Sequence, residues 1–226
     1  MENLSRRYFV IALVAGVILF GAEDAAAASK SKRQPGSSPT FSYYLLVLSY
    51  APDFCAQPSG KKDPRECGTG QRDGFVVHGL WPQSDTSRGP EYCSPASPVS
   101  QEIVRTMLRY IPTQSLIQHE WSTHGTCSAL SAADYFASIR KARDSINLPP
   151  DLNQPHQKEQ WTPDEIEAKL AAANPRFPRA AFRTSCYRDG ELQEVRICLN
   201  KDLSPRACGP SAGECRAAQI LLLPLQ

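Results

Sequence analysis

Residues 41–52 read FSYYLLVLSYAP, and residues 75–83 read FVVHGLWPQ. Both stretches are rich in apolar and aromatic residues, and each meets a proline near its end. Short apolar runs bounded by turn-forming residues are typical of buried β-strands. We therefore predict one buried strand over 41–52 and a second over Phe75–Trp81, which Gly79 and Pro82 would stop.

Outward from these strands, the middle of the chain carries three helix-start signals. Ser97 precedes Pro98, as a capping residue does when proline takes the first helical position. Ser131 and Thr162 each stand three residues before an acidic residue, which is the pattern of a capping box. The signals predict helices over Val99–Tyr110, Tyr135–Ile146 and Thr162–Asn174.

Two further strands are expected near the C-terminus. Ala181–Tyr187 and Leu192–Leu199 have strand-like composition, and Asp189 and Gly190 between them form a turn signal. The order of strands, then helices, then strands predicts an α+β fold with a central antiparallel sheet packed with helices. A chain of 226 residues suits one such domain, over 41–226, with an N-terminal extension.

The N-terminal extension has two predicted parts. Residues 1–28 follow the pattern of a cleaved export signal, with Arg6 and Arg7 before an apolar run that is short for a bilayer span. SRRYFV also resembles a twin-arginine signal, and an ordinary secretory signal or a membrane anchor is the alternative. Residues 29–40 are polar and basic and predict a flexible leader. We expect an exported mature protein, periplasmic or secreted, without a membrane segment.

The cysteines point in the same direction. An even number of cysteines in an exported chain predicts four disulfides, which would staple the fold, and their pairing stays open. A paired C-x-x-C pattern is absent from the sequence, which argues against a structural zinc site. The formal charge of +2 is compatible with a polyanionic partner but does not require one. The cysteines are Cys55, Cys67, Cys93, Cys127, Cys186, Cys198, Cys208 and Cys215.

Residues 119–127 read HEWSTHGTC and hold two of the four histidines. In a helix, His119, Glu120, Thr123 and His124 would lie along one stripe and face the same space. Zinc hydrolases carry H-E-x-x-H, with histidines four apart. Here the histidines are five apart, which turns the second imidazole away from the first and disfavours a zinc site without excluding it. A pair of purely structural histidines is the other alternative.

His78 lies at the predicted end of a strand, where a side chain is held by the sheet but reaches past it. Together with His119 and His124 it suits RNA cleavage, because one imidazole can take a proton while another gives one. A base removes the proton of the 2′-hydroxyl, and an acid protonates the departing 5′-oxygen. Such a scheme needs no metal or other cofactor. His156 has no companions in the sequence and is expected at the surface.

FVVHGLWP and HEWSTHGTC resemble the two active-site signatures of the ribonuclease T2 family. LVLSYAPDFC, which ends at Cys55, is similar to that family's first core strand. CYRDGELQEVRICLN, which begins at Cys186, is similar to its C-terminal hairpin. These stretches cover most of the chain from about residue 41 to 215, and two separate blocks in the right order are a far stronger signal than either alone.

The resemblance implies a role for each site residue. His78 corresponds to the general acid, His124 to the general base, His119 to the imidazole that contacts the phosphate, and Glu120 to the carboxylate that assists there. Trp81 matches an aromatic residue of the base-binding region, where stacking is worth roughly 1–3 kcal/mol per base. The cysteine pairs that the resemblance implies are Cys55–Cys67, Cys93–Cys127, Cys186–Cys215 and Cys198–Cys208.

Two substrate-binding positions depart from the family pattern. Thr123 stands where lysine is usual and brings no positive charge, and the loss of one preorganised donor can cost roughly 3–4 kcal/mol in the transition state. Gln83 stands where aspartate is common.

The resemblance implies an exported, monomeric endoribonuclease that cleaves single-stranded RNA by metal-independent transesterification to 2′,3′-cyclic phosphates and then to 3′-phosphates. DNA lacks the 2′-hydroxyl and would not be cut. The alternatives are a catalytically weakened RNA-binding protein on the same scaffold and a zinc-dependent hydrolase.

Overall fold

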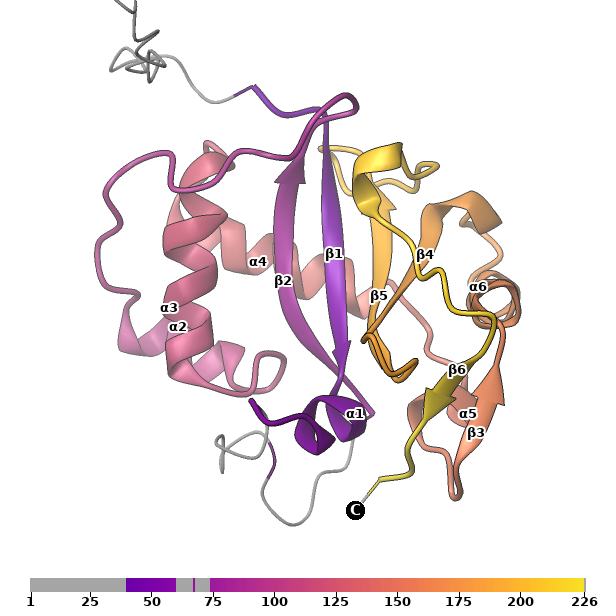
Figure 1. Ribbon diagram of the computed structural model, residues 1–226. Coiled ribbons are helices and arrows are strands. Elements are labelled where there is room, and N and C mark those ends of the chain that lie inside the picture. The colour runs from indigo at the N-terminus through magenta and orange to yellow at the C-terminus, as the bar shows by residue number, and fades with distance from the viewer. Residues whose placement is uncertain (1–39, 60–66, 68–73, 226) are drawn as a thin grey trace, which may run out of the picture. The chain divides into compact units, whose positions relative to one another are not determined.

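A computed structural model describes residues 40–59, 67 and 74–225 of the protein (Figure 1). The predicted export signal and nearly all of the predicted leader therefore lie outside the described residues. Within the described part of the chain, no helix is both long enough and apolar enough to cross a membrane.

Four antiparallel strands form the central sheet, as the sequence predicts. Their order across the sheet is β2-β1-β5-β4, so β1 and β5 are the inner strands. The strands are β1 (Tyr43–Tyr50), β2 (Phe75–Gln83), β4 (Phe182–Cys186) and β5 (Leu192–Leu199). A separate two-stranded sheet pairs β3 (Glu159–Trp161) with β6 (Ile220–Leu222).

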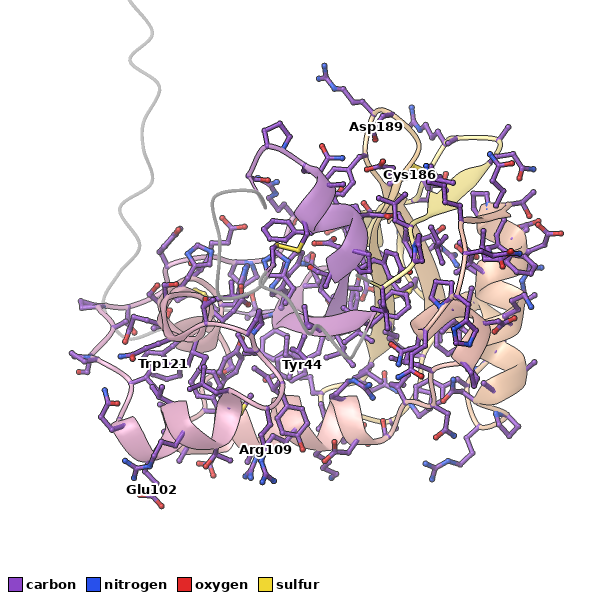
Figure 2. The ribbon with its side chains drawn as sticks, turned by 90° about the horizontal axis from the view of Figure 1, so that it is seen from below. Tyr44, Glu102, Arg109, Trp121, Cys186 and Asp189 are labelled. Atoms are coloured by element: carbon purple, nitrogen blue, oxygen red, sulfur yellow. A yellow bond between two sulfur atoms is a disulfide. The ribbon has the colours of Figure 1, made fainter. Side chains whose placement is uncertain are left out.

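The helices complete the α+β fold. Figure 1 shows α2 and α3 beside β2 at one end of the sheet, and α6 beside β4 at the other. Figure 2 shows Tyr44 inside the molecule, whereas Glu102 and Arg109 point outward from α2 and the turn that follows it. The helices are α1 (Ala51–Ala56), α2 (Gln101–Met107), α3 (Gln114–Thr123), α4 (Ala132–Asp144), α5 (Pro150–Asn153) and α6 (Pro163–Ala173).

Two of the three predicted helix starts are confirmed. The Ser131 hydroxyl caps α4, and Thr162 forms a complete capping box with Glu165 at the start of α6. The predicted cap at Ser97 is wrong, because Ser100 caps α2 through the amide of Ile103. The residues before Ser100 are extended, and the amide of Val99 donates to the side chain of Gln118 instead of entering a helix.

The predicted end of the second strand is also wrong. β2 continues through Gly79 and Pro82 to Gln83. Proline is tolerated there because β2 is an edge strand, where the missing N–H costs no ladder bond. The first predicted strand ends two residues early, since Ala51 and Pro52 enter α1, with proline at its first turn.

The core lies on both faces of the sheet, which explains the continuous apolar sequence of β1. On one face, Tyr44, Leu46, Leu48 and Tyr50 join the large cluster that includes the helices. On the other face, a smaller cluster contains Tyr43, Leu45, Val47, Cys198 and Ala212. Ser49 follows Val47 on this second face and is only half-buried, so the small cluster ends where the polar side chains of the site begin.

All four cysteine pairs implied by the family resemblance are present. Cys93–Cys127 joins the loop after β2 to the 3-10 helix Gly125–Cys127, directly behind α3. Two pairs hold the C-terminal part of the chain against the sheet. The remaining bonds are Cys55–Cys67, Cys186–Cys215 and Cys198–Cys208.

Candidate active site

His78 occupies a β-bulge in the middle of β2, not the strand end that the sequence suggested. In the pairing with β1, Val47 lies opposite Gly79, and Leu48 lies opposite Val77, so His78 is the extra residue. A bulge redirects its side chain relative to a regular strand. Residues three apart normally face opposite sides of a sheet, yet the rings of His78 and Trp81 lie 5.1 Å apart, edge to face.

Glu120 is the point at which β2 and α3 meet. Its carboxylate is fully buried and accepts the indole N–H of Trp81 at 2.9 Å, while its other oxygen lies 3.6 Å from Nε2 of His78. Gly79 makes this approach possible, because a Cβ there would lie 1.7 Å from the Glu120 carboxylate. Burial raises the pKa of Glu120 to about 7, although His78 and the indole of Trp81 act in the opposite direction.

His124 and Thr123 close the C-terminal end of α3. Thr123 is the last residue of the helix and His124 is its C-cap, so the stripe predicted for a continuous helix ends here. The His124 ring stacks on Trp81 with centroids 5.0 Å apart. Burial lowers the pKa of His124 to about 3, and His78 and His119 act in the same direction. The ring is therefore neutral near pH 7.

Three buried polar atoms around this end of α3 have no hydrogen-bond partner among the described residues: Oε1 of Glu120, Oγ1 of Thr123 and Nδ1 of His124. A buried polar atom without a partner costs roughly 1–3 kcal/mol. Such atoms in a folded protein indicate a place where strain or a ligand has to be considered. Their grouping at three residues of one helix end, next to two imidazoles, is typical of a site rather than of a packing fault.

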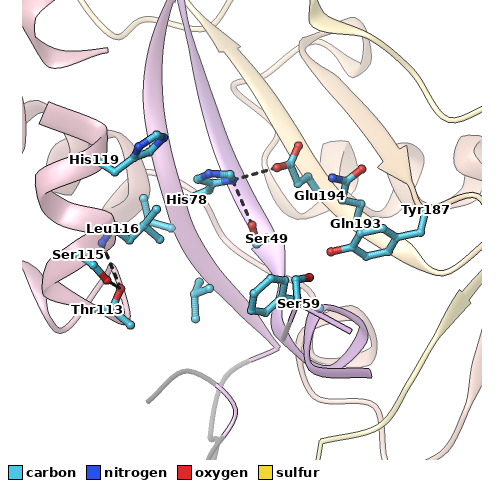
Figure 3. A pocket seen from close by; sticks show the side chains of 13 residues that line it. Ser49, Ser59, His78, Thr113, Ser115, Leu116, His119, Tyr187, Gln193 and Glu194 are labelled. Carbon is cyan, nitrogen blue, oxygen red and sulfur yellow. Dashed lines mark hydrogen bonds and ion pairs between the residues drawn. The ribbon is translucent and has the colours of Figure 1, made fainter. Parts of the chain in front are cut away.

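His119 lies on the solvent side of α3 and lines a cavity of about 480 Å³ together with His78 (Figure 3). Apolar walls come from Phe54 and Leu116, and Tyr187 lies on the opposite side. The cavity has the size and mixed lining expected of a small-molecule or nucleotide site. Within the described part of the chain, neither lysine nor arginine lines it.

The structure thus brings His78, His119, Glu120, His124 and Trp81 into one region, with Thr123 beside His124. His156 is exposed, as expected. Gln83 is buried at the far end of β2, where its backbone pairs with Tyr43 and Ser42.

For a metal, the described residues offer no group of three or more His, Cys, Asp or Glu side chains that could hold an ion.

Comparison with known proteins decides the family. A family model described as the ribonuclease T2 family matches residues 41–208. The chain belongs to the ribonuclease T2 family. Among its relatives, a probable ribonuclease of Haemophilus influenzae is 31% identical over 180 residues, covering 74% of this chain and 60% of its own length. A ribonuclease of Aeromonas hydrophila is 31% identical over 201 residues, covering 82% of this chain and 84% of its own length.

Solved structures of the ribonuclease T2 family share the fold. The RNase-related protein from Calystegia sepium is 19% identical, with a TM-score of 0.66 over 82% of this chain and 98% of that one. RNase NT in complex with 5′-AMP is 24% identical, with a TM-score of 0.58 over 75% of this chain and 96% of that one. The family match and the curated ribonucleases identify the chain as an endoribonuclease of the T2 type.

One group at the ribonuclease T2 site was missed from the sequence. Glu194 of β5 is 3% exposed and lies 3.0 Å from Nδ1 of His78, opposite the side that faces Glu120. Its signal was visible in LQEVRICL: Glu194 and Arg196 are two charged residues, two positions apart, in an otherwise mostly apolar strand. Residues two apart face the same side of a strand, so the pair predicts a buried ion pair within the sheet.

Proposed function

We propose that the protein is an exported endoribonuclease that cleaves single-stranded RNA without a metal, first to 2′,3′-cyclic phosphates and then to 3′-phosphates. The observation that carries the proposal is the meeting of His78 and His124 at Trp81 and Glu120, with His119 at the adjacent cavity. Proton transfer to and from RNA needs two groups in opposite protonation states within reach of one phosphate.

His124 suits the general base. Its ring is buried and neutral near pH 7, so it can accept the proton of a 2′-hydroxyl. The attacking oxygen then forms a bond to phosphorus within the same nucleotide, which makes the step intramolecular.

His78 suits the general acid. Glu194 and Glu120 lie on its two sides, and neighbouring carboxylates favour the protonated imidazole. The protonated ring gives its proton to the departing 5′-oxygen. His119 would contact a non-bridging phosphate oxygen, and Glu120, 3.6 Å from Nε2 of His78, would assist there.

The substrate class follows from the same chemistry. The nucleophile is the 2′-hydroxyl of RNA, which DNA lacks. A cavity of about 480 Å³ beside His78 has room for one nucleoside, and a base can enter it only when it is not stacked in a duplex. Phe54 and Tyr187 offer apolar and aromatic walls for that base.

A weakened catalyst is the second candidate, and Thr123 favours it. The lysine that is usual in the family would contribute a charge to the developing phosphorane. Thr123, which is 4% exposed, instead contributes a hydroxyl that has no hydrogen-bond partner in the described residues. An RNA-binding protein with slow turnover would retain the cavity and the imidazoles while lacking this charge.

The test is incubation of the purified protein with an RNA homopolymer in EDTA, with product ends identified by mass. We expect 2′,3′-cyclic phosphates that convert to 3′-phosphates, and no cleavage of the corresponding deoxy polymer. His78→Ala and His124→Ala should abolish cleavage, and His156→Ala, which removes an exposed histidine, is the matched control.

Other results separate the alternatives. Loss of cleavage in EDTA with recovery in zinc would support a metal-dependent hydrolase. Binding of RNA without cleavage, with activity gained in Thr123→Lys, would support the weakened scaffold. Export is tested separately, by the mass of the N-terminus of the protein recovered outside the cytoplasm, which should begin near residue 29.

A further inference from the structure

An ion pair lies beneath His78, between the buried carboxylate of Glu194 and the partly buried guanidinium of Arg196. The carboxylate of Glu194 accepts hydrogen bonds from Nε and Nη2 of Arg196 at 2.9 and 2.8 Å, and its other oxygen lies 3.0 Å from Nδ1 of His78. Although burial acts to raise it, the bond to His78 and the charge of Arg196 hold the pKa of Glu194 below its ordinary value. The carboxylate is therefore charged while His78 lies against it.

The side chain of Arg196 is also held by a contact with the backbone. Its Nη1 donates to the carbonyl of Ala212 at 2.7 Å, at the end of the 3-10 helix Pro210–Ala212. The next residue, Gly213, has φ +71°, and a Cβ there would lie 2.6 Å from Nη1 of Arg196. Glycine therefore permits both the left-handed backbone and the close approach of the guanidinium. The chain of contacts runs from this turn through Arg196 and Glu194 to His78.

A buried ion pair is a poor source of stability, because desolvation offsets much of its attraction. Glu194 and Arg196 occupy an inner strand where apolar residues would pack at lower cost. Their contact with His78 supplies a reason for their presence that packing does not. In catalytic triads of other enzymes, a carboxylate on Nδ1 selects the tautomer and orientation of an imidazole.

We propose that Glu194, held by Arg196, is a positioning residue that fixes the ring of His78 and keeps its proton on Nδ1, so that Nε2 faces the reacting phosphate. The inference rests on the proposed function for the role of His78 as the acid. Glu194 is 3% exposed and also lines the cavity, but in this scheme it acts through His78 and not on the substrate. Its oxygens are already engaged by Arg196 and His78.

The surroundings of His78 set the sign of the expected pH effect. Three elements bring side chains toward the ring of His78. From α3 and its C-terminal end come Glu120, His119 and His124, from β5 come Glu194 and Arg196, and from β1 comes Ser49. Glutamine at 194 removes a negative charge next to the ring while Arg196 keeps its positive charge. The protonated form of His78 is then lost at lower pH, so the alkaline limb of the activity profile moves to lower pH.

The experiment measures kcat and KM against pH for wild type, Glu194→Gln and Glu194→Asp. For Glu194→Gln we expect kcat to fall roughly 10- to 100-fold with KM nearly unchanged, and the alkaline limb to move down by about one pH unit. Glu194→Asp keeps the charge and should keep the position of the limb. The matched control is Glu167→Gln, which removes a buried carboxylate that binds the amide of Thr184 away from the site.

A second readout does not depend on activity. The ¹⁵N shifts of the His78 ring in the wild-type protein should show the proton of the neutral ring on Nδ1. A neutral ring protonated on Nε2, or a folded Glu194→Gln with unchanged kcat and pH profile, would overturn the inference while leaving the proposed function intact. If wild type cleaves no RNA, the proposed function fails, and the ring shifts still decide whether Glu194 fixes His78.

Discussion

Asp53 and Glu120 are both fully buried carboxylates, and burial raises the pKa of each to about 7. Their surroundings differ. Each oxygen of Asp53 accepts a backbone amide, from Leu192 at 2.8 Å and from Leu223 at 2.9 Å. Within the part of the chain that the structure describes, Glu120 accepts one hydrogen bond, from the indole of Trp81, and its second oxygen accepts none.

The difference separates a carboxylate held by the backbone of the fold from the one that the proposed mechanism uses. Asp53 joins α1 to β5 and to the C-terminal segment, and the hydroxyl of Tyr50 adds a bond to the carbonyl of Leu223. Both of its oxygens are engaged by backbone amides of the fold. Oε1 of Glu120 makes no hydrogen bond among the described residues and has only the 3.6 Å approach to His78, and one polar atom each of Thr123 and His124 likewise makes no hydrogen bond there. A site that is to bind a phosphate has to keep such capacity open.

The largest expected effect is a loss of RNA cleavage on substitution of His124, next to Glu120 at the proposed site. His124→Ala removes the proposed base, and general base catalysis contributes roughly 10²–10⁴-fold. We expect kcat/KM for RNA to fall by that factor, with RNA binding retained, in a cleavage assay at pH 6–7. His156→Ala, at an exposed position, should cleave like wild type. Equal activity in the two variants would mean that His124 is not the base, and that the surroundings of Glu120 are no more important for cleavage than those of Asp53.

Substitution of Asp53 should lower the stability of the fold instead of the activity. Asp53→Ala leaves the amides of Leu192 and Leu223 without an acceptor, and each unsatisfied buried donor costs roughly 1–3 kcal/mol. We expect the free energy of unfolding in urea to fall by about 3 kcal/mol, while kcat of the folded protein stays within a factor of two. Asp151→Ala removes an exposed carboxylate and should change neither. A large loss of kcat in stable Asp53→Ala would show that the two regions are coupled.

Features made by residues close together in the sequence were predictable, whereas features made by contacts between distant residues were missed. The capping box at Thr162 was predictable because it is made by residues three apart. The bulge at His78 was not, because it exists only in the register between β2 and β1. The sequence predicted the cap at Ser97 and not at Ser100, because nothing in the local sequence shows that the amide of Val99 donates to Gln118.

The site shows the same limit. The family signatures led to the imidazoles and Glu120, but no local pattern shows that Gly79 is needed for the approach of Glu120. Glu194 lies more than a hundred residues after His78 in the chain. The two side chains come together because β5 and β2 are the neighbours of β1 on its two sides, so that they meet across β1. Likewise β3 and β6, with three residues each, are too short for a strand period and depend on their pairing.

The pH dependence of stability gives a smaller effect that tests Glu120 directly. Its pKa is about 7 in the folded protein and 4.5 ordinarily, so folding is favoured by proton uptake. This contribution of about 3 kcal/mol is fully present below pH 4.5 and is lost as the pH rises from 4.5 through 7. Glu120→Gln should lose less stability than wild type between pH 4.5 and 8 in urea unfolding. Asp53, with its pKa also raised, should keep part of the slope in that variant. An unchanged slope would mean that Glu120 is charged throughout.

Thr123→Val gives the smallest effect, and we expect it to change stability and activity in opposite directions. The hydroxyl of Thr123 is buried without a partner in the folded protein, and valine has nearly the same shape without the polar group. Removing an unsatisfied hydroxyl should raise the free energy of unfolding by about 1 kcal/mol. If the hydroxyl donates to the phosphate in place of the usual lysine, kcat should fall about tenfold at the same time. Thr123→Ser keeps the hydroxyl and should retain kcat. A variant that gains stability without losing kcat would mean that the hydroxyl of Thr123 has no part in catalysis.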